Sequence, residues 1–250
     1  MKLLKNKTAI ITGAGSGIGE SVAKLFADNG ARLVLTDIDE KGGKRVLKDV
    51  KEKGAEAIFV KADSGSAKDN EMVIGEAQKA FADVHIAVNN AGIGGAQAPV
   101  GAYPIESWDK VIGVNLSGVF YGMRYQIPAM LKAGGGSIIN MASILGQVGF
   151  EQSAAYVAAK HGVIGLTKNA ALEYSKAGIR VNAVGPGFIK TPLIDENLPQ
   201  EQQDQLAGLH AIGRLGKPEE VAELVLWLAS EKASFVCGSY YPIDGGYLAR

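Results

Sequence analysis

The sequence predicts one α/β domain of the doubly wound type, in which helices cover both faces of a mostly parallel sheet of about seven strands. Three observations lead to this prediction. Short apolar runs alternate with amphipathic segments, a glycine-rich loop joins the first run to the first helical segment, and no linker interrupts the 250 residues. Repeated strand and helix units favour parallel pairing, because each helix returns the chain to the same edge of the sheet.

In the first half of the chain, several runs combine apolar and β-branched residues over the length of a strand. They are residues 8–12, 32–37, 57–60 and 86–88. The stretches between them have the periodicity or composition of helices. These are residues 21–27, a charged segment that ends at Lys53, and residues 67–81.

The second half continues the alternation. A helical span from about Trp108 past Met130 leads to a strand that ends at Met141, and residues 153–177 are expected to form the next helix. The later elements are a strand at 180–184, a helix at 218–229 and a strand at 240–243. Residues 191–212 have weak periodicity, so we predict a mobile substrate lid there.

Charge and composition argue against several kinds of partner. Lys plus Arg and Asp plus Glu number 26 each, so no global positive field attracts nucleic acid or an anionic membrane. The first residues lack a signal-like apolar core and no apolar run approaches the ~18 residues of a membrane span, which predicts a cytoplasmic protein. The single cysteine, Cys237, excludes an intrachain disulfide, and the three histidines lack the spacing of metal ligands.

Tyr156 and Lys160 form a candidate catalytic pair. Their spacing in an alanine-rich segment places a phenol and an ammonium group side by side on one helical face. A tyrosine pKa of about 10 is too high for proton transfer at neutral pH, unless a nearby cation favours the phenolate. Ser143 follows the apolar run 137–141, so its hydroxyl is expected at the carboxyl end of a buried strand, where ligands bind in open α/β sheets. Taken alone, the pair also fits an ordinary helical tyrosine beside a solvated lysine.

The glycine-rich loop at residues 13–19 strengthens the functional interpretation. It lies between the strand 8–12 and the helical segment 21–27. In that context bare backbone N–H groups and the helix N-terminus can face a pyrophosphate. The flanking elements favour this interpretation over a flexible turn.

Further motifs stand in a fixed order along the chain. They are T-G-x-x-x-G-x-G at 12–19, N-N-A-G at 89–92, the tetrad Asn115, Ser143, Tyr156 and Lys160, and P-G-x-x-x-T at 186–191. In these residues the chain resembles the short-chain dehydrogenase/reductase family over essentially its whole length. The resemblance implies a Rossmann fold and reversible hydride transfer between NAD and a secondary alcohol or ketone.

The resemblance also implies a role for each member of the tetrad. Tyr156 exchanges a proton with the substrate oxygen, and Lys160 lowers the pKa of Tyr156 and holds the nicotinamide ribose. Ser143 hydrogen-bonds the substrate oxygen. Asn115 lies within a helical run, where it is expected to hold a water that links Lys160 to solvent. A kink of the helix at Asn115 is compatible with that role.

Asp37 predicts NAD rather than NADP. It ends the second strand, where a carboxylate accepts hydrogen bonds from the adenosine ribose and repels a 2′-phosphate, and Ile38 follows it in place of a basic residue. Asp39 is at least as well placed to cap the next helix. By resemblance, Asp63 contacts the adenine amine and Asn89 lines the adenosine side. The whole expected cofactor set is Gly13, Ser16, Gly17, Ile18, Gly19, Asp37, Ile38, Asp63, Ser64, Asn89, Ala91, Gly92, Tyr156, Lys160, Pro186, Gly187, Ile189 and Thr191.

The expected substrate contacts are mostly apolar and favour an apolar ketone or a cyclic alcohol. They are Ser143, Leu145, Phe150 and Gly187. A sugar or polyol stays open because Gln147 and Gln152 could donate hydrogen bonds. A 3-oxoacyl-acyl-carrier-protein reductase is a further alternative, although residues 133–136 and Leu172 are not basic where those reductases tend to dock their carrier. A non-catalytic dinucleotide sensor is disfavoured by the intact tetrad.

Assembly as a homotetramer is expected by resemblance, through paired long helices and the C-terminal strand. The helical segment 153–177 carries Val157, Ile164, Leu166 and Leu172, an apolar surface that can cover the sheet and also a partner helix. A helix that covers only its own sheet is the alternative.

Overall fold

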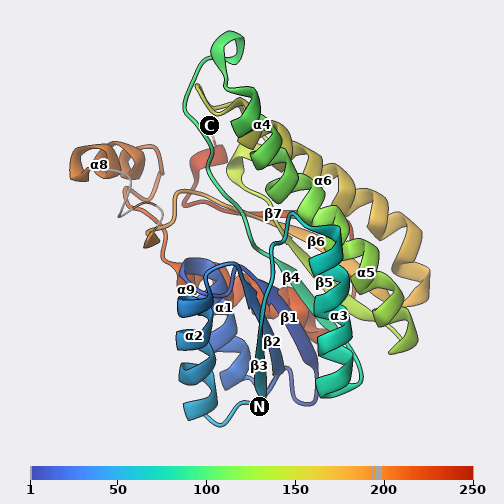
Figure 1. The fold of residues 1–250 in the computed structure, drawn as a ribbon. Helices are drawn as coiled ribbons and strands as arrows, with labels where there is room; N and C mark the ends of the chain where they lie inside the picture. Colours follow the sequence, from blue (N-terminus) through green and yellow to red (C-terminus); the bar gives the residue numbers. More distant parts are fainter. Residues whose placement is uncertain (1, 193, 195–198, 250) are drawn as a thin grey trace.

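The computed structural model describes residues 2–192, 194 and 199–249, and its centre is one parallel sheet of seven strands (Figure 1). The strand order is β3-β2-β1-β4-β5-β6-β7, and every neighbouring pair is parallel. The strands are β1 Thr8–Thr12, β2 Arg32–Asp37, β3 Ala57–Lys61, β4 Ile86–Asn89, β5 Gly136–Met141, β6 Ile179–Pro186 and β7 Tyr240–Ile243. The predicted doubly wound single domain is confirmed.

Helices connect the strands and form two outer layers. They are α1 Gly17–Asp28, α2 Glu40–Glu52, α3 Ala67–Phe81, α4 Ile105–Ile112, α5 Gly118–Lys132, α6 Ala154–Tyr174, α8 Gln200–Gly208 and α9 Pro218–Ala229. Helices α1, α2 and α9 lie on one face of the sheet, while α3, α5 and α6 lie on the other (Figure 1).

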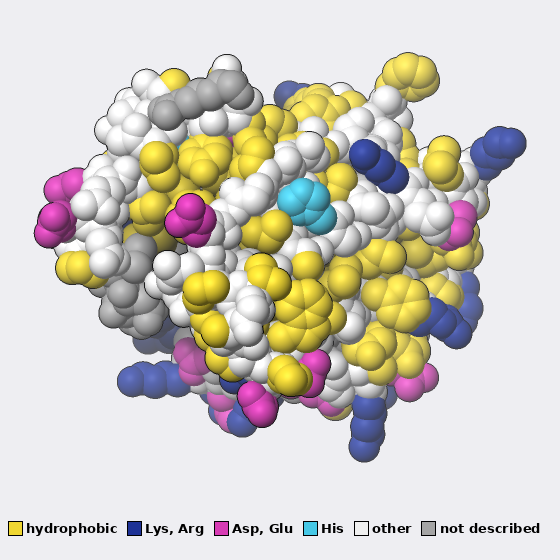
Figure 2. All heavy atoms as spheres, turned by 90° about the horizontal axis from the view of Figure 1, so that it is seen from above, with side chains coloured by type: hydrophobic (Ala, Val, Ile, Leu, Met, Phe, Trp, Pro, Cys, Tyr) yellow, Lys and Arg dark blue, Asp and Glu magenta, His cyan; other side chains and the backbone are white. Residues whose placement is uncertain are grey.

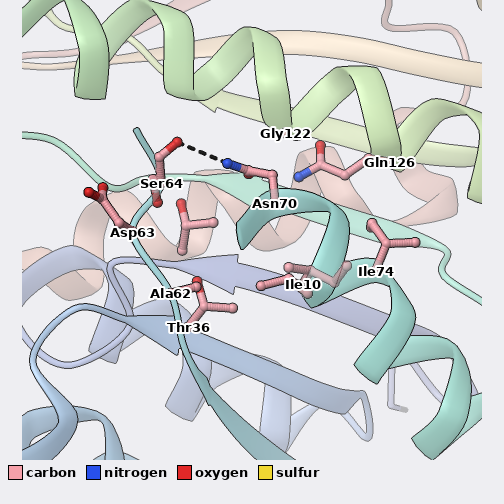
Figure 3. Close-up of a pocket in the computed structure, with 11 residues that line it drawn as sticks. Ile10, Thr36, Ala62, Asp63, Ser64, Asn70, Ile74, Gly122 and Gln126 are labelled. Atoms are coloured by element: carbon pink, nitrogen blue, oxygen red, sulfur yellow. Dashed lines mark hydrogen bonds between the residues drawn. The ribbon is translucent and has the colours of Figure 1, made fainter. Parts of the chain in front are cut away.

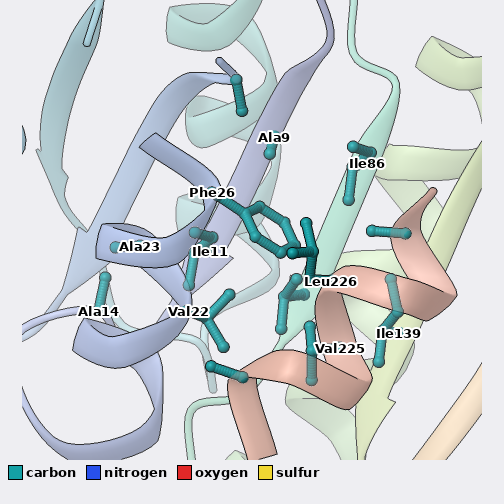
Figure 4. Packing of buried hydrophobic residues seen from close by; sticks show 14 of the residues in the cluster. Ala9, Ile11, Ala14, Val22, Ala23, Phe26, Ile86, Ile139, Val225 and Leu226 are labelled. Carbon is teal, nitrogen blue, oxygen red and sulfur yellow. The ribbon is translucent and has the colours of Figure 1, made fainter. Parts of the chain in front are cut away.

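The core is divided by the sheet into two apolar clusters. Side chains alternate between the faces of a strand, so Ile11 packs toward α1 and α9 whereas its neighbour Ile10 packs toward α3 and α5. Phe26, which is fully buried, lies at the centre of the first cluster beside Val225 and Leu226 of α9 (Figure 4). Strands buried on both faces explain why the sequence shows continuous apolar runs instead of alternation.

The strand order creates a crevice at the carboxyl edge of the sheet. The chain proceeds outward from β1 to β2 and β3, and then crosses to β4 on the other side of β1. The loops after β1 and β4 therefore leave in opposite directions and leave room for a ligand between them. This position is where the predicted site residues converge.

The helical span expected from about Trp108 past Met130 is interrupted by a π-helical turn. Residues Gly113–Ser117 form this turn between α4 and α5, with the Gly118 N–H donating to the carbonyl of Gly113. Asn115 lies at its centre and is fully buried. Single π turns often occur at functional sites, because they redirect one side chain within a helix.

Candidate active site

The glycine loop folds into a tight cradle at the start of α1. Gly13 has a φ of 63° and Gly17 a φ of 53°, in the left-handed region that favours glycine. A Cβ atom at Gly19 would overlap the carbonyl oxygen of Gly13, so the loop can close in this way only without a side chain there. Ser16 is the N-cap of α1 but its side chain makes no capping hydrogen bond, which leaves backbone N–H groups of the first turn directed toward the loop.

Two residues outside the expected set hold this cradle in place. The amide of Asn90 donates to the carbonyl of Thr12 at 2.9 Å and to that of Gly13 at 3.1 Å. The hydroxyl of Thr12 accepts hydrogen bonds from the N–H groups of Asn90 and Ala91. The ends of β1 and β4 are thereby tied together, a role that the N-N-A-G sequence alone does not specify.

The predicted nicotinamide segment reaches the same loop. A Cβ at Gly17 would lie 3.2 Å from the Cγ2 of Thr191, so the end of the P-G-x-x-x-T segment covers the glycine cradle. The side chain of Ile189, by contrast, is buried in the core, and the segment pairs with Gly216 through its backbone. Any contact of Ile189 with a cofactor must therefore come from its main chain.

Asp37 lies directly against the glycine loop. One carboxylate oxygen accepts the N–H of Gly15 at 2.8 Å and the other accepts the N–H of Asp39 at 2.9 Å. Asp39 caps α2 by accepting the N–H of Lys41, as the sequence suggested. Ile38 is 66% exposed beside the loop, where a flat apolar group can lie on it. The carboxylate is thus fixed at the carboxyl end of β2, at the position expected for a ribose contact.

A small pocket lies between strands β1 and β2, the loop after β3, and helices α3 and α5 (Figure 3). Thr36, Asp63 and Ser64 are among the residues that line it. Asn70 of α3 donates to the carbonyl of Ser64 at 2.9 Å and fixes this wall, as the dashed line in Figure 3 shows. The Asp63 side chain accepts the N–H of Gly65, which orients it near the expected adenine side.

The side chain of Asn89 does not lie in this pocket, which differs from the expectation. Its amide donates to the side-chain oxygens of Gln126 and Asn140, and the Asn140 amide donates in turn to the hydroxyl of Thr167. Asn89 is the last residue of β4 and points toward α5 and α6 instead of the crevice. It therefore braces the sheet beneath the site, and any cofactor contact must come from its backbone.

Tyr156, in the first turn of α6, meets Ser143 at the carboxyl edge of the sheet. Burial raises the pKa of Tyr156, and a hydrogen bond from the Ser143 side chain lowers it in part. Ser143 also accepts the N–H of Leu145 in the short helical turn that follows β5. The structure thus brings together the two groups that the sequence assigned to one substrate oxygen.

Lys160 is almost fully buried beneath the ring of Tyr156. Its ammonium donates to the carbonyl of Met141 at 2.7 Å and lies 5.4 Å from the centre of the Tyr156 ring. Burial lowers the pKa of Lys160 to about 8. The hydrogen bond from Ser143 is the contact that lowers the pKa of Tyr156 in part, and the Lys160 ammonium faces the Tyr156 ring. The expected effect of the Lys160 charge on this pKa stays a prediction.

Asn115 completes the group by bracing the loop after β4. Its side chain accepts the N–H of Ile93 and donates to the carbonyl of Ile93, each at 2.8 Å. A Cβ at Gly92 would lie 3.3 Å from the Asn115 side-chain oxygen and 3.8 Å from the Lys160 ammonium. Gly92 thus lies close to both Asn115 and Lys160. The Asn115 side chain makes its hydrogen bonds with the backbone of Ile93.

The predicted substrate contacts lie at different depths. Leu145 is only 6% exposed, whereas Phe150 is 37% exposed and packs on Phe188 with ring centres 5.8 Å apart. The hydroxyl of Tyr240 donates to the Ser143 carbonyl at 3.0 Å, a contact that no local sequence pattern predicts.

Seen from above, on the side of α4 and α8, the molecule shows hydrophobic side chains across the middle of the face and most Lys and Arg toward its rim (Figure 2).

The described residues also bear on membrane and metal binding. No helix among them has the length and apolar character needed to cross a membrane. In the same part of the chain, no group of three or more His, Cys, Asp and Glu is arranged to hold a metal ion.

Comparison with known proteins agrees with this geometry. The sequence profile of a family described as enoyl-(acyl carrier protein) reductase matches residues 13–248. The chain is 49% identical to cyclohexanol dehydrogenase of Acinetobacter sp. (strain SE19), covering 98% of this chain and 96% of that protein. It is 41% identical to cis-4-hydroxycyclohexanecarboxylate dehydrogenase of Sinomonas cyclohexanicum, covering 97% of each. The crystal structure of levodione reductase superposes with a TM-score of 0.95 at 35% identity, covering 98% of this chain and 99% of that one.

The fold, the glycine cradle and the Tyr156 site define an oxidoreductase that uses a nicotinamide dinucleotide. The chain belongs to the short-chain dehydrogenase/reductase family. Its activity is hydride transfer between NAD(P) and a secondary alcohol or ketone.

Proposed function

We propose that this protein oxidises an alicyclic secondary alcohol to the ketone with NAD as the hydride acceptor. The observation that carries the proposal is the contact between Ser143 and Tyr156 above the buried Lys160, at the open carboxyl edge of the sheet. The relatives named for cyclohexane alcohols, together with the apolar and aromatic residues near Ser143, support a ring-shaped substrate.

The chain fits a dinucleotide by its own geometry. Gly13, Gly17 and Gly19 form a cradle that side chains would fill, and Asp37 lies at the adenosine side of it. When bound, NAD supplies the carbon that accepts the hydride. The proposed ligands are the glycine loop for the pyrophosphate, Asp37 for the adenosine ribose and Lys160 for the nicotinamide ribose.

The protein's own part of the reaction is proton transfer and substrate positioning. The Ser143 hydroxyl hydrogen-bonds the substrate oxygen and holds it beside Tyr156. Tyr156, as the phenolate, takes the hydroxyl proton as the alcohol is oxidised, and returns it in the reverse direction. A protonated Lys160 favours that phenolate by its charge, and the Met141 carbonyl keeps the ammonium in place.

NAD is proposed over NADP because of Asp37. Its carboxylate is fixed by Gly15 and Asp39, so it would meet a 2′-phosphate as a like charge at short range. Ile38 offers that phosphate no cation, and its exposed side chain suits an adenine ring.

A homotetramer is the proposed assembly. Several large apolar side chains of α4 and α5 are exposed, among them Ile105 at 72%, Trp108 at 40% and Phe120 at 47%. Exposed apolar patches of this kind are typical of surfaces that another subunit covers. A sizing measurement that gives a monomer at micromolar concentration would remove this part of the proposal.

A panel of alcohols tests the proposed activity. NADH formation from NAD and NADPH formation from NADP are measured with cyclohexanol, 2-butanol and sorbitol. The reduction of an acetoacetyl thioester by NADH and by NADPH is measured in parallel. We expect the highest kcat/KM for cyclohexanol with NAD. Activity restricted to sorbitol or to the thioester would favour the polyol or carrier-protein alternative, and NAD binding without any turnover would favour a sensor.

A further inference from the structure

Aromatic rings from separate segments meet beside the predicted substrate region. Phe188 lies at their centre, with its ring 5.8 Å from Phe150, 5.7 Å from His210 and 6.0 Å from Tyr247. His210 and Tyr247 are themselves 5.9 Å apart. These residues come from the loop after Ser143, the segment after β6, the turn after α8 and the C-terminal turn. We call them the aromatic cluster.

His210 holds the backbone of Phe188 as well as its ring. The Nε2 atom of His210 accepts the N–H of Phe188 at 3.1 Å, and the His210 side chain is only 3% exposed. A Cβ at Gly187 would lie 2.7 Å from the same Nε2 atom, so glycine at 187 is what allows the segment to approach the imidazole. One histidine therefore fixes Phe188 by a hydrogen bond and by an edge-on ring contact.

The hydrogen bond from the Phe188 N–H defines which tautomer the neutral His210 ring adopts. Because Nε2 is the acceptor, the neutral ring carries its proton on Nδ1. That Nδ1 atom is buried and has no hydrogen-bond partner among the described residues. An unpaired buried donor lowers stability and is uncommon in folded proteins, so it suggests a functional constraint on His210.

Phe188 and Ser143 lie at the same edge of the sheet, because they follow two neighbouring parallel strands. Phe188 follows β6, which pairs with β5 along its length, and Ser143 follows β5. Tyr240 links the two regions, because its hydroxyl donates to the Ser143 carbonyl while its ring lies against Gly185 at the end of β6. Phe150, on the segment after Ser143, and Phe188, on the segment after β6, thus form a tilted aromatic wall at this edge of the sheet, and Phe150 is partly exposed.

We propose that His210 is a positioning residue that gives the enzyme its preference for alicyclic over open-chain alcohols, by fixing Phe188 in the wall formed with Phe150. This inference rests on the proposed function. A rigid wall of two rings matches the fixed shape of an alicyclic ring, which loses little conformational freedom on binding. A flexible open chain must be ordered first and gains less from the same wall.

The test compares kcat/KM for cyclohexanol and 2-butanol at saturating NAD. In His210→Leu the acceptor for the Phe188 N–H is lost, and we expect kcat/KM for cyclohexanol to fall about tenfold or more, mainly through KM, with a much smaller change for 2-butanol. In His210→Gln an amide oxygen can take the place of Nε2, so the preference should be largely restored. A purely structural role would lower activity toward both alcohols alike.

Two more variants keep the outcome decisive. Phe188→Leu leaves the backbone and His210 in place and should lose the preference even if His210→Leu fails to fold. Phe235→Leu changes a fully exposed phenylalanine outside the cluster. This control variant should keep the preference for cyclohexanol over 2-butanol. An unchanged preference in Phe188→Leu, or equal losses in the two His210 variants, overturns the role of His210 while the proposed function stands. A wild-type protein that oxidises no secondary alcohol overturns the proposed function, and the preference with it.

Discussion

The ammonium group of Lys160 donates a hydrogen bond to the carbonyl of Met141 at 2.7 Å, which ties helix α6 to the end of strand β5. Ser143 follows Met141 by two residues, so a single strand end positions both the lysine beneath Tyr156 and the serine beside it. A buried ammonium with one carbonyl partner is costly to keep charged, and burial lowers the pKa of Lys160 to about 8.

The first prediction concerns stability and pH in the absence of NAD. A lysine with a lowered pKa releases its proton first in the folded state, so between pH 8 and pH 10.5 the unfolded state holds more protons and stability rises with pH. We expect the free energy of unfolding of the wild type, relative to Lys160→Met, to increase by about 2 kcal/mol from pH 7.5 to pH 9.5. Denaturant titrations of both proteins measure this difference, and a value that does not change with pH would contradict a lowered pKa.

The second prediction concerns the glycine cradle. A side chain at Gly19 would overlap the Gly13 carbonyl and deform the loop, so Gly19→Ala should weaken NADH binding by about tenfold or more. Gly75→Ala is the matched control, because a Cβ at this α3 position meets no atom within 4 Å. It should leave binding unchanged and raise stability by about 0.5–1 kcal/mol. Fluorescence titration with NADH measures the affinity of both variants. Equal affinities would rule out a close-packed pyrophosphate loop.

The third prediction concerns cofactor choice. Replacing Asp37 by Ala removes charge-assisted hydrogen bonds worth roughly 1.5–3 kcal/mol each, and replacing Ile38 by Arg adds a planar cation for the 2′-phosphate. The double variant should therefore shift from NAD toward NADP in kcat/KM. Because the two sites are neighbours, their effects need not add. A wild type that already prefers NADP, or a double variant with unchanged preference, would remove Asp37 as the discriminator.

The fourth prediction concerns the proposed lid at residues 191–212. Residues 193 and 195–198 lie outside the described part of the chain, so the prediction is limited to α8. Helix α8 buries only Gln203, which predicts weak protection without ligand. Hydrogen exchange of this segment should slow when NAD and a ketone analogue bind. Equal exchange in the free and bound protein would argue against closure.

Local patterns were sufficient to predict many elements to the residue. The bounds predicted for β1, β2, α3, α9 and β7 match the structure. Two of these have strong local signals, since the Ser66 side chain caps α3 and Pro218 starts α9. The assignment of the tetrad comes from the family resemblance and stays a prediction, although the structure places Ser143 beside Tyr156 and Lys160 beneath its ring.

The structural features that could not be predicted from the sequence depend on contacts between distant segments. The π-helical turn at Asn115 and the burial of Asn89 follow from packing of α5 and α6 on the sheet, and neither alters the local apolar pattern. His210 is 22 positions beyond Phe188, and the sequence around it indicates only that the three histidines lack the spacing of metal ligands. Tyr240 likewise reaches Ser143 from the last strand. Such pairings become visible only when the sheet order is known.

The most direct test of the proposed mechanism is the turnover number of Tyr156→Phe with cyclohexanol and NAD. The variant removes the phenol oxygen and keeps the ring that lies over Lys160, so NADH binding, measured by fluorescence, serves as the control for an intact site. If Tyr156 is the proton-transfer group, kcat should fall by about 100-fold to 10,000-fold while the NADH dissociation constant stays nearly unchanged. A variant that keeps more than about a tenth of the wild-type kcat would contradict the assignment.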